Sequence, residues 1–294
     1  MPRLTSETGV LTYDKAKTKP GYTLFSTLGL FETTLVDMDG AVVHSWKLPG
    51  EPGNYAYMLP DGHLLAAIRT QVGILGLPAK GGHLIEYDWD GNIVWEHEDN
   101  TQHHDFRRLA NGNTIYLAWR LLDEDMVKRH TGGLAGSEHA DGVYGDVLRE
   151  INPAGEGVWE WFVGTDMDME QFPIHPGTWR QEYAHGNTVA ECPNGDIMIN
   201  QRMTGFMGHI DKQTKKIQLV PAGSRVRPAA RRADAGERQH IVFRQRLHAR
   251  VLPWPGSGLT GDRTRPCRQL HCLGIFDQGA PGFFFLVHLG LSAA

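Results

Sequence analysis

VDMDGAVVHSW (36–46), YDWDGNIVWE (87–96) and INPAGEGVWEW (151–161) are three copies of one phrase, and a degraded copy, IDKQTKKIQL, begins at Ile210. Each copy predicts a turn between two short strands. Asp-Gly and Asn-Gly pairs supply the positive φ that two-residue hairpin turns need, and hydrophobic residues alternate on either side of them. The phrase therefore indicates β-hairpins.

A second phrase alternates with the first. Its copies are MLPDGHLLAAI (58–68), RLANGNTIYLAW (108–119) and ECPNGDIMIN (191–200). Gly40 and Gly91 are 51 residues apart, and Gly62 and Gly112 are 50 apart, so a unit of two hairpins recurs about every fifty residues. Four strands at this period are typical of a β-propeller blade. We therefore predict an all-β fold of the β-propeller class.

The phrases divide the chain into a lead-in (1–20), propeller blades (21–222) and a tail (223–294). We expect two strands around the Asp39-Gly40 turn and further strands at 55–69, 83–97, 106–120, 147–163 and 184–210. Two stretches break the period: an insertion with a short helix that Gly132-Gly133 ends (121–145), and a long loop (164–182). Tryptophans follow the turns at equivalent points and are predicted to pack blade against blade: Trp46, Trp95, Trp159 and Trp161.

The composition suits one large all-β domain. The 294 residues carry a net charge of −5, which indicates no particular partner, and three cysteines, which form no disulfide framework. No secretory signal is visible at the start, and no apolar run is long enough to span a membrane, so we expect a cytoplasmic protein without a membrane span. The sequence leaves the oligomeric state open.

The tail differs from the rest of the chain. Residues 223–294 hold eleven Arg, no Lys and four acidic residues, and they lack Asn, Met and Tyr. A basic arm for nucleic acid usually mixes Lys with Arg, so we expect no nucleic-acid partner. Out-of-frame GC-rich codons yield Arg, Pro, Ala and Gly, and we interpret this Arg/Pro-rich tail as a frameshift, with disorder as the alternative. The coding DNA of residues 215–245 tests this interpretation.

Two histidine-bearing stretches occupy the same position in two blades. QHHDF (102–106) and HGNTV (185–189) each stand at the start of a strand that leads to an Asn-Gly turn. We expect His104 and His185 to face each other, and the hairpin that follows to bring Arg202 back beside His185. A histidine at a strand start otherwise caps a turn or bonds a carbonyl, which is the structural alternative.

A metal site is a second alternative at these histidines. His103, His104, Asp105 and His185 are ligand types that suit Zn²⁺ or Fe²⁺. Adjacent residues on a strand point to opposite faces, so His103 and His104 are not expected to ligate one ion together. We therefore predict neither a metal nor a cofactor.

Several phrases together resemble the bacterial arylsulfate sulfotransferase (arylsulfotransferase) family over about residues 21–220. They are GYTLF (21–25), LVDMDGAVVHSW (35–46), LIEYDWDGNIVWE (84–96), HHDFRRLANGNTIYLAWR (103–120) and HGNTVAECPNGDIMINQR (185–202). The resemblance implies a six-bladed propeller and an enzyme that moves a sulfuryl group from an aryl sulfate to a phenol through a sulfated histidine. It implies that His104 and His185 bind the sulfuryl oxygens or shuttle the phenol proton and that Arg202 is the fixed cation.

The chain departs from this family in the tail. The copy of the phrase that carries the family's nucleophilic histidine is expected near residues 225–240, and His240 and His248 lack its pattern. Residues 21–222 suffice for about three and a half blades, so we expect an incomplete, aggregation-prone propeller with impaired transfer. The alternative function is a non-catalytic propeller that binds a partner, since propellers host many functions.

Overall fold

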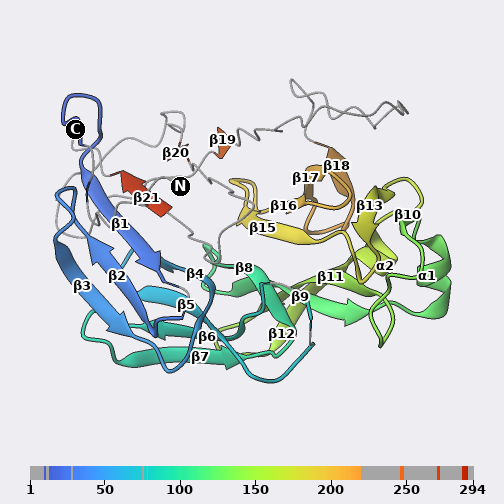
Figure 1. Cartoon of the computed structure of the whole chain (residues 1–294), viewed down its shortest axis with the longest axis horizontal. Coiled ribbons are helices and arrows are strands. Elements are labelled where there is room, and N and C mark those ends of the chain that lie inside the picture. The colour runs from blue at the N-terminus through green and yellow to red at the C-terminus, as the bar shows by residue number, and fades with distance from the viewer. Residues whose placement is uncertain are drawn as a thin grey trace, which may run out of the picture. The chain divides into compact units, whose positions relative to one another are not determined.

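The computed structural model describes residues 10, 13–27, 29–74, 76–77 and 79–219, and three short strands in the tail. The tail strands are β19 (Arg246–Leu247), β20 (Leu270–His271) and β21 (Val287–Gly290). The chain divides into two compact units. Figure 1 labels the strands of both. The first comprises Met1–Arg69, Leu84–Glu96 and Arg238–Ala294, and the second comprises Thr70–His83 and His97–Glu237.

Two four-stranded sheets carry the first unit. In one, β1 and its neighbours pair antiparallel in the order β21-β1-β2-β3, and in the other the order is β4-β5-β6-β7. β1 packs against β4. The strands are β1 (Gly21–Ser26), β2 (Glu32–Val36), β3 (Val42–Lys47), β4 (Pro52–Met58), β5 (Leu64–Arg69), β6 (Gly82–Tyr87) and β7 (Ile93–Glu98).

The second unit repeats the plan. One sheet has the order β8-β9-β11-β12, with β14 added parallel to β11, and the next has the order β15-β16-β17-β18. β15 packs against β8 and β9. The strands are β8 (Gln102–Arg108), β9 (Thr114–Leu121), β11 (Tyr144–Ile151), β12 (Gly157–Phe162), β14 (Glu182–Tyr183), β15 (Gly186–Glu191), β16 (Ile197–Gln201), β17 (Phe206–Ile210) and β18 (Ile217–Leu219).

Apart from β21 and β14, the strands of each of these sheets lie in chain order before the chain moves to the next sheet, as in the meander of a propeller blade. The all-β propeller class predicted from the repeats is therefore confirmed. The prediction of two strands over 21–48 was wrong: three strands lie there, because the GYTLF stretch pairs with the Glu32–Val36 strand. In the same sheet, β21 supplies the strand on the other side of β1.

The turns differ from the predicted two-residue type. Asp37 N donates to Ala41 O, and Gly40 N donates to Asp37 O, so three residues form the loop. Gly40 has φ +82°, whereas Asp39 is not in the left-handed region. A type I turn followed by a left-handed glycine produces this three-residue hairpin, and a two-residue type I′ turn would need positive φ at both central residues. In the degraded copy Lys215 takes the left-handed position, at φ +59°.

The two stretches that break the period pair with each other. α1 (Glu124–Arg129) begins at Asp123, whose carboxylate accepts from Met126 N, and ends before the predicted Gly132-Gly133 stop. Those glycines open β10 (Gly132–Leu134), which runs parallel to β13 (Ile174–Trp179). The long loop predicted at 164–182 thus contains a strand and the end of α2 (Val163–Asp166). Local patterns do not reveal pairing between segments some forty residues apart.

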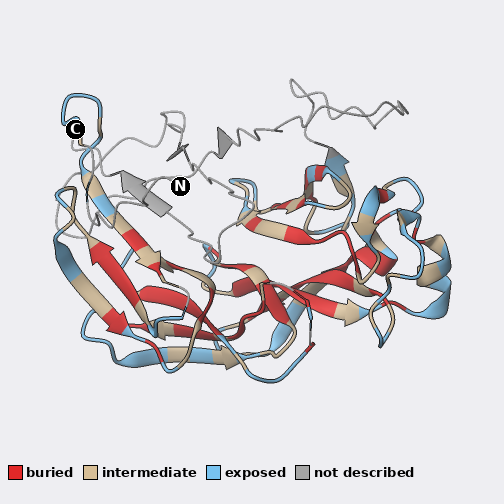
Figure 2. Ribbon diagram, in the orientation of Figure 1, coloured by how far each residue is buried: buried red, intermediate tan, exposed pale blue. Residues whose placement is uncertain are grey.

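Buried residues are concentrated in central strands of the four-stranded blade sheets, such as β5, β9 and β11, Figure 2. The indole nitrogens of three repeat tryptophans donate across to the next sheet: Trp46 to Asp88 O at 2.9 Å, Trp159 to Lys212 O at 2.9 Å and Trp161 to Lys215 O at 3.2 Å. The predicted packing of sheet against sheet is confirmed at these positions. Trp95, at the equivalent place in β7, is half-buried.

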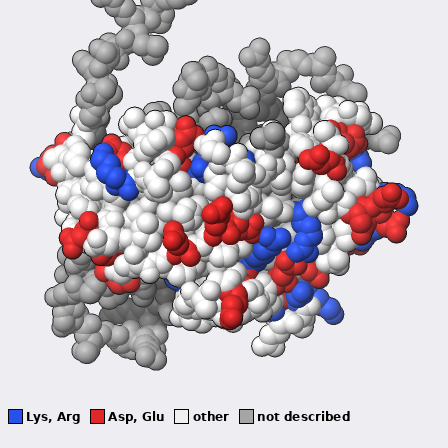
Figure 3. Space-filling model, turned by 90° about the horizontal axis from the view of Figure 1, so that it is seen from below, with Lys and Arg blue, Asp and Glu red and all other residues white. Residues whose placement is uncertain are grey.

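Acidic and basic side chains are intermixed on the face seen in Figure 3 and do not separate into fields of one sign. No helix within the described ranges has the length and apolar character needed to cross a membrane. The expectations for the tail, including those for His240 and His248, concern residues outside the described ones.

Candidate functional site

His104 and His185 meet in the second unit. His104 lies in β8, and His185 directly precedes β15. Their ring centroids are 4.7 Å apart, with the ring planes at 68°. Both residues have a left-handed backbone, with φ +47° and +57°, and so does Ala184 at +81°. Left-handed backbone is costly for side chains other than glycine and concentrates at functional sites.

His103 and His104 do not point to opposite faces, so the alternation predicted for them was wrong. Their Nδ1 atoms are 2.9 Å apart. The register of β8 shifts between His103 and Phe106, and His104 has positive φ, so the two-residue alternation of the strand is interrupted at this point. The irregular backbone therefore gathers three histidines instead of two.

Arg202 returns to the cluster, as the hairpin predicted. Arg202 N donates to His185 O at 2.9 Å, and Met203 N donates to Ala184 O at 3.0 Å. The Arg202 side chain is exposed. Its positive charge is one of the causes that lower the pKa of His104. The positive charge of Arg202 therefore lies near enough to act on His104.

Two buried carboxylates lie beside the histidine rings, and one of them is hydrogen-bonded to a ring. Glu182 Oε1 lies 2.5 Å from His185 Nδ1, and Trp119 Nε1 donates to Glu182 Oε2 at 3.0 Å. Asp146 Oδ2 accepts from Gly186 N at 2.5 Å, and Asp146 Oδ1 lies 3.5 Å from His103 Nε2. The sequence analysis missed both acids. The available signal was an acidic residue inside the otherwise buried strand YGDVLREI.

Burial keeps two of the imidazoles neutral. His103 is fully buried and stacks on Trp119 at 4.1 Å, and burial followed by the charge of His185 lowers its pKa to about 3. Burial, and then the neighbouring histidines and Arg202, lower the pKa of His104 well below its ordinary value. Burial and then the charge of Glu182 raise the pKa of Asp146. The site therefore offers neutral imidazole nitrogen near neutral pH.

Asp105 serves a different purpose from the metal ligand considered above. Its two carboxylate oxygens accept from Phe106 N and Val189 N, each at 2.8 Å, and Arg107 Nη1 lies 2.8 Å away. The side chain therefore ties β8 to β15 and holds the two histidine positions together. In the described part of the chain, one group brings three ligand-type atoms within 4.8 Å, and it is Asp61, His63 and Glu86 of the first unit.

A separate hollow of about 820 Å³ lies in the second unit, and none of its lining residues belongs to the histidine cluster. Arg149 Nη1 lies 2.5 Å from Asp99 Oδ2, which also accepts from the Tyr116 hydroxyl at 3.0 Å. His97 Nε2 lies 3.2 Å from that hydroxyl. These side chains bind one another through hydrogen bonds and an ion pair, so they form a polar network in the wall of the hollow.

No protein-family model matches the chain, and no curated protein matches it. Among solved structures, it is similar to a protein of unknown function from Bacteroides caccae, with 13% identity over 69% of this chain and 74% of that one, at a TM-score of 0.34. It is also similar to the Kuenenia stuttgartiensis hydrazine synthase, with 14% identity over 63% of this chain and 48% of that one, at a TM-score of 0.40. The WD40 β-propeller domain of Doa1 is similar with 13% identity over 62% of this chain and 44% of that one, at a TM-score of 0.36. The chain spans less than half of these last two.

Proposed function

We propose that the second unit transfers a sulfuryl group from an aryl sulfate to a phenol at the cluster of His104, His185 and Arg202. The observation that carries the proposal is the distance of 4.7 Å between the two histidine rings, one in β8 and one directly before β15. The backbone of an exposed arginine, Arg202, is hydrogen-bonded to His185. The resemblance of the HHDF and HGNT phrases to the arylsulfotransferases gives the reaction type. The tail is not needed for the chemistry described below.

The family's nucleophilic histidine is expected near residues 225–240, where its phrase is missing, so we assign the nucleophile of the first half-reaction to His104. The lone pair of its Nε2 attacks sulfur, the S–O bond to the aryl group breaks, and that electron pair goes to the phenolate oxygen. His185 enters as the imidazolium beside Glu182 and gives one proton to this oxygen. The products are the phenol, neutral His185 and N-sulfohistidine with a cationic ring and an anionic sulfonate, so protons and charge balance.

The second half-reaction reverses the first with an acceptor phenol. Neutral His185 takes the hydroxyl proton, the phenol oxygen attacks sulfur, and the S–N bond breaks with its electron pair returning to His104. Arg202 neutralises the sulfonate oxygens, on which charge resides in an in-line displacement. His103 holds the His104 ring through the contact between their Nδ1 atoms, which favours Nε2 as the attacking atom.

The test is release of 4-nitrophenol from 4-nitrophenyl sulfate with phenol as acceptor. Turnover is expected to fall at least about 100-fold in H104N, H185N and R202Q. Asparagine tolerates the left-handed backbone of the two histidines, so these variants keep the fold. H175N, at an exposed histidine of β13, is the control and keeps full activity.

Mass spectrometry of enzyme quenched without acceptor is expected to find one SO₃ group on the peptide that contains His104. Binding of the aryl sulfate with no release of phenol would overturn the transfer proposal in favour of a binding scaffold. Release that persists in H104N without an adduct at that position would overturn the assignment of the nucleophile.

A further inference from the structure

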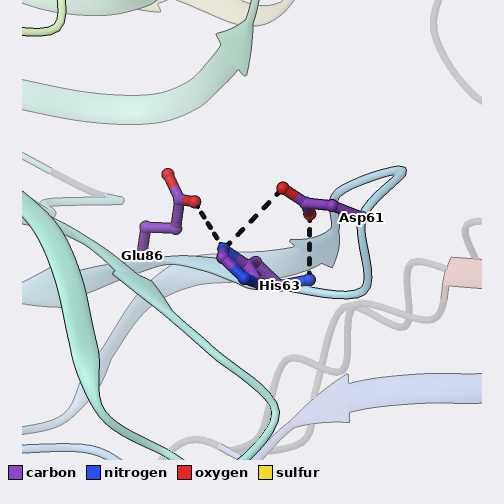
Figure 4. A group of neighbouring side chains, drawn as sticks. All are labelled: Asp61, His63 and Glu86. Carbon is purple, nitrogen blue, oxygen red and sulfur yellow. Dashed lines mark hydrogen bonds and ion pairs between the residues drawn. The ribbon is translucent and has the colours of Figure 1, made fainter.

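Three ligand-type side chains converge in the first unit at the turn between β4 and β5. His63 Nδ1 lies 2.8 Å from Glu86 Oε1 and 3.8 Å from Asp61 Oδ2. Figure 4 shows the two carboxylates approaching the same ring nitrogen, one from β6 and one from the turn. Asp61 is exposed, and the other two are half-buried, so one side of the group is open to solvent.

Equivalent positions in two other sheets hold a related polar pair. Asn113 Nδ2 donates to Glu150 Oε1 at 2.7 Å across β9 and β11, and His209 Nδ1 lies 3.3 Å from Asp196 Oδ2 across β16 and β17. A polar pair after the Gly of the turn is thus a recurring element of the repeat. The β4–β5 turn is different because an acid, Asp61, stands where the other two turns have asparagine.

The second acid, Asp61, leaves the turn itself intact. Asp61 Oδ1 accepts from His63 N at 3.1 Å and closes the turn, while its Oδ2 faces the imidazole. Asn111 Oδ1 accepts from Asn113 N at 2.9 Å in the same way. The turn therefore requires one side-chain oxygen, and the aspartate provides a second that is available for another role.

The surroundings favour a cation. A hollow of about 320 Å³ beside the group is lined by Asp61, His63, Asp88, Trp89 and Asp90, among others. The carboxylates of Asp61, Asp88 and Asp90 therefore lie along one hollow with the imidazole of His63, and this concentration of acidic side chains attracts a cation.

We propose that the first unit binds one Zn²⁺ ion through Nδ1 of His63, a carboxylate oxygen of Glu86 and Oδ2 of Asp61, with water completing the coordination. One imidazole nitrogen and two carboxylate oxygens with an open side are a zinc ligand set. The three ligand atoms already lie within 4.8 Å of one another, so small side-chain movements suffice to enclose an ion. This site is independent of the sulfuryl-transfer proposal, because its residues belong to the other unit.

Isothermal titration of the full chain with Zn²⁺, without any substrate, tests the site. D61N converts the turn to the Asn-Gly form that the second unit uses at Asn111 and Asn194, so it removes a ligand and keeps the turn. H63N places at this position the residue that follows the turn glycine in the second unit, Asn113. Each variant is expected to lose one equivalent of bound Zn²⁺, or to weaken its binding at least about 100-fold.

D196N is the matched control, because it alters a histidine–carboxylate pair at the equivalent turn of another sheet. It is expected to retain the wild-type stoichiometry, as is H104N, which reports on the histidine cluster of the second unit. Equal stoichiometry and affinity in wild type and D61N would overturn the proposal. So would loss of the same equivalent in D196N.

Discussion

Replacement of Trp161 by phenylalanine tests the indole bonds that join one sheet to the next. Trp159 and Trp161 both lie in β12, and both donate to carbonyls of the turn between β17 and β18, at 2.9 Å and 3.2 Å. They differ in burial: Trp161 is fully buried, and Trp159 is half-buried. The pair therefore separates the contribution of the hydrogen bond from that of the packed ring.

The expected losses follow from these contacts. Either substitution removes one hydrogen bond, with a net contribution of about 1 kcal/mol. W161F also leaves a void beneath a ring with no solvent access, which adds about 1–2 kcal/mol. The free energy of unfolding should therefore fall by about 2–3 kcal/mol in W161F and by about 1 kcal/mol or less in W159F.

Urea unfolding followed by far-ultraviolet circular dichroism measures both variants without relying on tryptophan fluorescence. With a urea dependence of about 2 kcal/mol per molar, the midpoint should fall by about 1 M or more in W161F and by no more than about 0.5 M in W159F. Equal midpoints for the two variants, or a larger loss in W159F, would refute the argument that the buried ring stabilises the contact between sheets.

Two further changes follow from the second unit. In G186A the new Cβ would lie 2.9 Å from Leu117 Cδ2 and 3.0 Å from Asp146 Oδ2, so thermal melting should show a loss of about 1–3 kcal/mol, whereas G157A, with open space around its Cβ, should melt like wild type. Burial opposes ionisation of Asp99, but hydrogen bonds from Thr101 and the charge of Arg149 outweigh it, and its pKa lies below the usual value. The stability that Asp99 contributes is therefore present above the unfolded-state pKa of about 3.9 and is lost as the pH falls below it. The difference in unfolding free energy between wild type and D99N should be constant from about pH 7 to 5 and shrink below about pH 4, and a constant difference down to about pH 3 would contradict this reasoning.

The repeat phrases were sufficient to predict the sheets and the turns between their strands. Their alternation and period depend on local chemistry, namely glycine at a left-handed position and hydrophobic residues on one face of a strand. The turn type was not predicted, because a two-residue and a three-residue hairpin accept the same Asp-Gly pair. The degraded copy at Ile210 still forms a hairpin, with Lys215 in place of glycine.

The site was predictable only in part. Equivalent positions in two repeats were enough to pair His104 with His185 and to bring Arg202 back beside them. The acids that orient the rings were not predictable, because Asp146 and Glu182 come from a neighbouring strand and from an insertion. Their contact with the histidines depends on the packing of segments that no repeat relates.

The sequence by itself determined the all-β class, the fifty-residue period and the hairpins, because these follow from interactions within one or two turns of chain. The equivalent places of the tryptophans in the repeats indicated their packing, although their hydrogen bonds join residues 42 to 54 positions apart. Tertiary structure alone decided that β10 pairs with β13, that His103 joins His104 on one side of a bulged strand, and that Asp61 adds a second carboxylate at His63. Such contacts depend on which distant groups share a buried or partly buried space. The free energy of burial and of hydrogen bonds between segments, and not local propensity, selects them.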